Sequence, residues 1–172
     1  MTTSKEIHWP EYYHPKHAQL HVRNETLIPA QADTIWSCLI HAPCWPQWGR
    51  AQTSVQILNG DGIELHKGTL FRWKARALHF DCTVVEYIPH KRIAWKGKCG
   101  DVDMYHAWLI EPTDDGCVVL TESTQRGGMT WLTRLFTSRN IHSYHKRWLD
   151  GLKKQPECKK QSSPKGQGEG LK

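Results

Sequence analysis

The sequence predicts an α+β protein in which one antiparallel sheet is covered by a long C-terminal helix. Segments with apolar residues at every second position, which are typical of strands, recur through residues 19–125. The connections between them are short, and this excludes a parallel sheet, whose strands need long crossovers. The last apolar segment, residues 129–154, has helical spacing instead. It is the only large helix available to cover the apolar face of the sheet.

The elements are expected in a simple order along the chain. A strand over residues 19–30 is followed by a helix within 29–40 and by a short helix or turn in 41–50, which holds two prolines. A further strand begins at residue 54 and runs into a loop rich in turn residues. Five more strands are expected, over residues 69–76, 79–88, 91–99, 102–111 and 116–125.

The composition indicates one soluble domain with two dissimilar ends. Of the 172 residues, 38% are hydrophobic and 23% are charged. We expect an N-terminal arm over residues 1–18, a ligand-binding domain over 19–154 and a disordered Lys-rich tail over 155–172. Because no apolar run reaches the ~18–20 residues of a membrane helix and the start lacks the apolar core of a signal peptide, we expect a cytoplasmic location. The six cysteines form no C-x-x-C pair, so we expect mostly buried thiols.

The net charge of +6 does not predict a nucleic-acid partner. Residues 153–172 contain six lysines and two glutamates, so most of the excess charge lies in the tail. The aromatic and basic residues that alternate in residues 71–76 lie on opposite faces of a strand. Burial of each ring contributes roughly 4–6 kcal/mol, so the rings should face the core and the cations should face water. These residues are Phe71, Trp73 and Ala75 on the inner face and Arg72, Lys74 and Arg76 on the outer face.

Several blocks resemble the polyketide cyclase/dehydrase group of the START-like, or SRPBCC, proteins. They are "IPAQADTIWSCLIHAPCWPQWG", "KGTLFRWK", "VVEYIPHKRIAWKG", "YHAWLIEPTDDGCVVLTES" and "HKRWLDGLKK". The resemblance covers about residues 20–154. It implies a helix-grip fold, in which a curved seven-stranded antiparallel sheet wraps around the C-terminal helix, with two short helices between the first two strands. It also implies a hydrophobic cavity, but no universal catalytic residue.

The candidate site residues follow from the faces of the strands. In residues 104–110, His106 and Trp108 share the face expected to point inward. If Leu120 and Glu122 also face inward, Glu122 could act with His106 as an acid/base pair. The candidate ligand contacts are Phe71, Trp73, Trp95, Trp108, Leu120, Leu135 and His145.

Two functions remain open at this point. The first is binding or transport of a hydrophobic or amphipathic small molecule, such as a lipid, a sterol or a polyketide, between the sheet and the helix. The alternative is a cyclase or dehydratase that uses His106 and Glu122. We expect no cofactor and no metal, because the pairs His14/His17 and His142/His145 lack matching ligands at zinc-site spacing. We expect a monomer or a weak dimer without a transmembrane segment; the basic tail could still contact an acidic protein or a membrane surface.

Deletion of residues 156–172 is expected to leave the melting temperature nearly unchanged. The segment is rich in Lys, Gln, Ser, Pro and Gly and has too few apolar residues to bury much surface. The melting temperatures of the full-length and truncated chains can be compared by circular dichroism. A decrease of more than a few degrees would show that the tail docks on the domain.

Overall fold

The computed structural model of the chain describes residues 6–49, 52–75, 78–127 and 138–155. Its strands form one sheet of seven, in the order β1-β7-β6-β5-β4-β3-β2, and every neighbouring pair is antiparallel. The strands are β1 (Leu20–Ile28), β2 (Gln52–Ile57), β3 (Leu70–Ala75), β4 (Leu78–Ile88), β5 (Arg92–Cys99), β6 (Val102–Thr113) and β7 (Gly116–Gly127).

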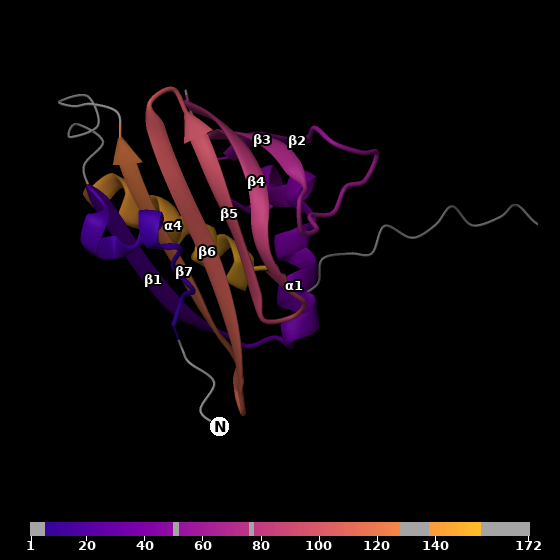
Figure 1. Ribbon diagram of the computed structural model, residues 1–172. Coiled ribbons are helices and arrows are strands. Elements are labelled where there is room, and N and C mark those ends of the chain that lie inside the picture. The colour runs from indigo at the N-terminus through magenta and orange to yellow at the C-terminus, as the bar shows by residue number, and fades with distance from the viewer. Residues whose placement is uncertain (1–5, 50–51, 76–77, 128–137, 156–172) are drawn as a thin grey trace, which may run out of the picture.

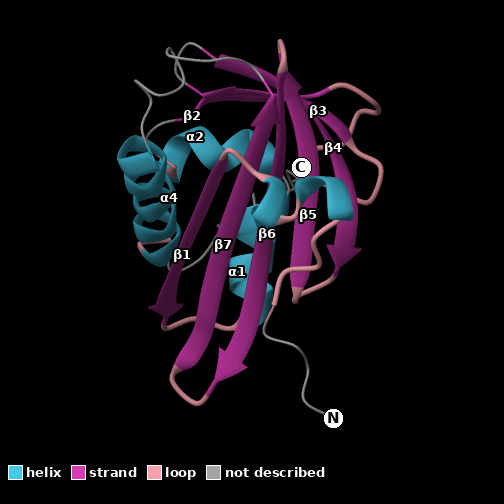
Figure 2. Cartoon of the chain, turned by 60° about the vertical axis from the view of Figure 1, so that its left-hand side comes forward, coloured by secondary structure: helices cyan, strands magenta, loops and turns pink. Residues whose placement is uncertain are grey.

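Helices lie mainly on one side of this sheet (Figures 1 and 2). The connection from β1 to β2 holds α1 (Ala32–Ile40), the single-turn helix η3 (Ala42–Cys44) and α2 (Trp45–Trp48). The C-terminal helix α4 (Ser138–Lys153) lies against β1 and α2. The predicted α+β class and helix-grip architecture are therefore confirmed. Residues 129–137 of the expected helix lie outside the described residues.

The main core lies between the concave face of the sheet and the helices. Ile35 and Leu39 of α1 are buried there, as are Trp148 and Leu152 of α4. Phe71 and Trp73 of β3 also belong to this core, which confirms the predicted orientation of their rings. On the other face, Arg72 donates two hydrogen bonds to Asp81 across the β3–β4 pair, at 2.6 and 3.0 Å. Arg76 lies outside the described residues.

Residues 6–18 of the N-terminal arm cover part of the convex face (Figure 2). The arm contains the single-turn helices η1 (Glu11–Tyr13) and η2 (Pro15–His17). Ile7 is buried in a second apolar cluster with residues of β5, β6 and β7, and Trp9 and Tyr13 pack against that cluster. The backbone carbonyl of Tyr13 accepts a hydrogen bond of 2.8 Å from Oγ1 of Thr124. The central strands are thus apolar on both faces. In the part of the chain that the structure describes, no helix is both long and apolar enough to cross a membrane.

Candidate ligand-binding site

His106 lies at the centre of the concave face of β6. Its neighbours on that face, Met104, Trp108 and Ile110, belong to the main core, because alternate residues of a strand share a face. The His106 side chain is fully buried, and Nε2 lies 2.9 Å from Oγ1 of Thr121 on the neighbouring strand β7. This hydrogen bond fixes the plane of the imidazole ring.

Four indole rings from four different elements surround this imidazole. Trp95 of β5 and Trp108 of β6 stack on it, with ring centroids 4.9 and 5.7 Å away. Trp148 of α4 presents an edge at 5.1 Å, and Trp73 of β3 lies at 6.0 Å. Sheet and helix therefore meet at His106 in a compact aromatic cluster.

A second buried histidine, His145 of α4, reaches the same cluster. Its ring centroid lies 4.8 Å from that of His106, and only 3% of the residue is exposed. Burial disfavours the charged form of both rings, and each also lies near another histidine. The pKa of His145 is lowered to about 3, and the pKa of His106 is also lowered well below its ordinary value. Both imidazoles are therefore neutral near pH 7.

Several nitrogen atoms of this cluster are buried without a hydrogen-bond partner among the described residues. They are Nδ1 of His106, Nδ1 of His145, and Nε1 of Trp73, Trp95 and Trp108. An indole N–H can only donate, so each of these tryptophans needs an acceptor. A buried polar group left unpaired costs about 1–3 kcal/mol. The cluster therefore suits a bound molecule, or buried waters, that brings hydrogen-bond acceptors into an aromatic surrounding.

Glu122 lies on the opposite face of the sheet from His106, so the conditional prediction of an inward-facing acid is wrong. His106 stands opposite Ser123 in the β6–β7 register, whereas Glu122 stands opposite Ala107. The Glu122 carboxylate is 5% exposed and accepts a 2.7 Å hydrogen bond from Nη1 of Arg23. Its other oxygen lies 2.8 Å from Nε2 of His21. Because alternate residues of β7 point to opposite faces, Glu122 and His106 do not form an acid/base pair.

The prediction that Leu120 contacts the ligand is wrong for the same reason, because Leu120 and Glu122 share one face of β7. Leu120 packs in the convex cluster beneath the N-terminal arm, whereas Cys117 and Val119 of β7 face the main core. The sequence pattern is ambiguous because β7 carries apolar residues on both of its faces. The N-terminal arm covers the convex face. Leu135 lies outside the described residues.

The structure brings the other predicted residues together. Phe71 packs edge to face on Trp95, at 5.7 Å between centroids, next to the cluster around His106. The site prediction did not include Trp45, although this ring stacks on Trp95 at 5.3 Å. The "WPQW" turn that carries Trp45 was visible in the sequence as part of the family resemblance. Within the described ranges, no group of three His, Cys, Asp or Glu side chains is placed to hold a metal ion.

The curved seven-stranded antiparallel sheet and the C-terminal helix against it define a helix-grip protein. The chain belongs to the family described as polyketide cyclase / dehydrase and lipid transport, which matches residues 19–157. No curated protein sequence matches this chain.

Solved structures support the same fold. Hypothetical protein jhp0584 from Helicobacter pylori is 26% identical, with a TM-score of 0.80 over 91% of this chain and 99% of that one. A START superfamily protein from Mycobacterium smegmatis is 14% identical, with a TM-score of 0.66 over 79% and 96% of the two chains. The Zhui aromatase/cyclase from Streptomyces sp. R1128 is also 14% identical, with a TM-score of 0.64 over 77% of this chain and 90% of that one.

Proposed function

We propose that the protein binds or transports a hydrophobic or amphipathic small molecule at the aromatic cluster around His106. The observation that carries this proposal is a fully buried imidazole whose Nδ1 has no partner among the described residues, although four indole rings surround it. Binding sites for small molecules are mostly apolar and aromatic, with a few polar atoms that fix the orientation of the ligand. The family's description, which names both lipid transport and cyclase chemistry, agrees with a ligand of this kind.

The electrostatics of the cluster favour a ligand without a buried charge. His106 and His145 are both neutral near pH 7, because burial lowers the pKa of each ring. A buried anion or cation without a counter-charge would be strongly disfavoured. The cluster therefore suits aromatic or alicyclic bodies that carry hydroxyl or carbonyl oxygens.

An acid/base enzyme built on His106 and Glu122 has no geometric support. The two side chains lie on opposite faces of the sheet, and Glu122 is held by Arg23 and His21. A catalytic pair must come within hydrogen-bond reach of the same substrate. Binding or transport is therefore the function that this site supports best.

Titration with a panel of sterols, fatty acids and aromatic polyketides is expected to change the intrinsic fluorescence saturably for at least one ligand class. The change should shrink in Trp108→Phe, because this variant keeps an aromatic ring at the cluster but removes one indole. Trp9→Phe is the matched control, since Trp9 packs on the convex face beside Tyr105. The same ligand should raise the melting temperature, because a molecule that binds only the folded state stabilises it, by about 2.7 kcal/mol at a hundredfold excess over Kd.

Two results would count against the proposal. One is a panel that gives neither a fluorescence change nor a thermal shift. The other is a fluorescence change that Trp9→Phe reduces as much as Trp108→Phe does, since the ligand would then not be at the cluster.

A further inference from the structure

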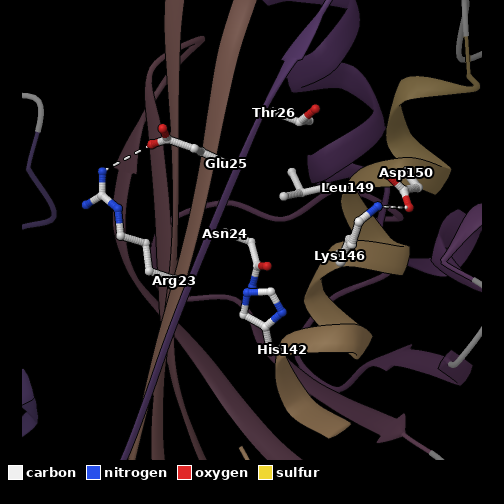
Figure 3. Close-up of a pocket in the computed structure, with 8 residues that line it drawn as sticks. All are labelled: Arg23, Asn24, Glu25, Thr26, His142, Lys146, Leu149 and Asp150. Carbon is white, nitrogen blue, oxygen red and sulfur yellow. Dashed lines mark hydrogen bonds and ion pairs between the residues drawn. The ribbon is translucent and has the colours of Figure 1, made fainter. Parts of the chain in front are cut away.

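A groove of about 330 Å³ lies between β1 and α4 (Figure 3). Residues 23–26 of β1 form one wall. Among the strands that the structure describes, β1 lies at one edge of the sheet and pairs with β7. The other wall comes from successive turns of α4, namely His142, Lys146, Leu149 and Asp150. The groove is large enough for one end of a small molecule.

A buried amide points into this groove. Asn24 is 9% exposed, and its Nδ2 has no hydrogen-bond partner in the described part of the chain. Asn24 and Thr26 lie on the α4 side of β1 in Figure 3, whereas Arg23 and Glu25 lie on its other side. An amide nitrogen only donates, so Nδ2 of Asn24 requires an acceptor, and none of the described residues accepts a hydrogen bond from it.

A line of polar side chains leads from the groove to the aromatic cluster. Asn24 stands directly opposite Thr121 in the β1–β7 register, so their side chains are neighbours on the concave face. Thr121 in turn bonds His106 at 2.9 Å. On α4, His142 lines the groove, and His145, three residues further on, lies against His106. Polar groups therefore connect the groove to the buried imidazole from both walls.

The charged side chains around the groove are paired with one another. Nζ of Lys146 lies 2.9 Å from Oδ2 of Asp150, and Nη2 of Arg23 lies 3.2 Å from Oε2 of Glu25. Arg23 also bonds the buried carboxylate of Glu122. Because these charges balance, the groove offers little attraction to a free carboxylate or to an ammonium group. An uncharged acceptor such as a ketone, ester or amide carbonyl suits Asn24 better.

We propose that this groove is the mouth of the ligand site and that Nδ2 of Asn24 donates a hydrogen bond to an uncharged carbonyl at one end of the ligand. The apolar body of the ligand then extends past Thr121 toward the rings around His106. This inference rests on the proposed function and narrows its ligand class to neutral amphipathic molecules with a terminal carbonyl. Free acids of the same shape are weaker ligands.

Three naphthalene probes of similar shape test the inference on the full-length protein. They are 2-acetylnaphthalene, with a neutral carbonyl, 2-ethylnaphthalene, with no acceptor, and 2-naphthoate, with a carboxylate. Their dissociation constants are measured by isothermal titration calorimetry. We expect the ketone to bind roughly two- to tenfold more tightly than the hydrocarbon, which is the effect of one neutral hydrogen bond, and more tightly than the carboxylate.

The variant Asn24→Asp should abolish the preference for the ketone. It keeps the shape of the side chain but replaces the N–H donor with an oxygen, so the affinity for 2-ethylnaphthalene should change little. Asn24→Leu, a second variant without a donor, should also bind the ketone and the hydrocarbon equally. Asn59→Asp is the matched control, because the amide of Asn59 already bonds the Gly68 carbonyl at 3.1 Å near the other edge of the sheet. Circular dichroism confirms that each variant is folded.

The outcomes separate this inference from the proposed function. If the wild-type protein binds the ketone and the hydrocarbon equally well, or if Asn24→Leu keeps the ketone preference, the assignment of Asn24 is overturned and ligand binding at the cluster stands. If the wild-type protein binds none of the three probes and no member of the wider panel, the proposed function fails as well.

Discussion

Gly151→Ala is expected to lower the free energy of unfolding by about 2–4 kcal/mol and the melting temperature by roughly 5–15 °C. Gly151 is buried in α4 at the point where this helix crosses α2. A Cβ atom at this position would overlap the backbone carbonyl oxygen of Trp48 and approach its carbonyl carbon to 2.9 Å. Backbone atoms cannot rotate away as a side chain does, so the two helices would have to separate.

Helix propensity alone would make Gly151→Ala stabilising, whereas we expect it to be destabilising. Alanine is favoured over glycine by about 1 kcal/mol in the interior of an exposed helix. The close approach of α4 to Trp48 therefore has to outweigh a gain in intrinsic helix stability. Thermal and urea unfolding of Gly151→Ala measure the net result.

Gly62→Ala is the matched control for this substitution. Gly62 lies in the loop between β2 and β3, its φ is not positive, and a Cβ there would meet no atom within 4 Å. The control should unfold at the wild-type temperature or slightly above it, because alanine restricts the unfolded chain. If Gly151→Ala behaves like Gly62→Ala, the close contact between α4 and α2 does not exist in solution.

The contact at Gly151 also positions the candidate site. Trp148, one turn earlier in α4, packs edge to face on Trp45 at 5.2 Å and tilted on Trp48 at 6.1 Å. The same Trp148 ring closes the cluster over His106. Separation of the two helices should therefore weaken ligand binding as well as stability.

The fold could be predicted because most of the strands alternate clearly. In β3, Phe71 and Trp73 alternate with Arg72, and only one phase can be buried. In β6, Met104, His106, Trp108 and Ile110 identified the concave face for a similar reason. The short connections between strands then determined an antiparallel sheet.

The polar part of the site could not be predicted in the same way. β7 has apolar residues in both phases, because the N-terminal arm covers its convex face, so periodicity does not tell which phase faces the helix. The partners of His106 depend on strand register, which brings Thr121 beside His106 and Asn24 opposite Thr121. Register between strands that are distant in sequence is set by packing in three dimensions and leaves no local pattern in the chain.

Stability is expected to fall steeply when the pH decreases from 7 to 5, because of His106 and His145. Burial lowers the pKa of both rings in the folded protein, to about 3 for His145, whereas a histidine in the unfolded chain titrates near 6.5. Below pH 6.5 the unfolded chain therefore binds more protons at these two positions than the folded chain does. The full contribution of the two neutral rings to stability is present above pH 6.5. It is lost as the pH falls toward the pKa values of the rings in the folded protein.

The size of the effect follows from proton linkage. Each buried neutral histidine contributes a slope approaching 1.4 kcal/mol per pH unit below about pH 5.5, so the two together remove roughly 3–4 kcal/mol between pH 7 and pH 5. The other titratable groups of the chain are shared by the wild-type protein and a single variant. The two buried rings are therefore best isolated by comparing variants.

His145→Gln should make the stability curve shallower between pH 6 and pH 5, by close to the slope of one histidine. Glutamine cannot be protonated, so this variant removes one of the two groups that take up a proton only on unfolding. His145→Gln can also change the free energy of unfolding through altered packing. Such a change is the same at every pH, so the slope of stability against pH is the diagnostic measurement. His79→Gln, at an exposed position on β4, is the matched control variant. Urea unfolding at several pH values gives both slopes; parallel curves for wild type and His145→Gln would contradict a neutral, buried His145 beside His106.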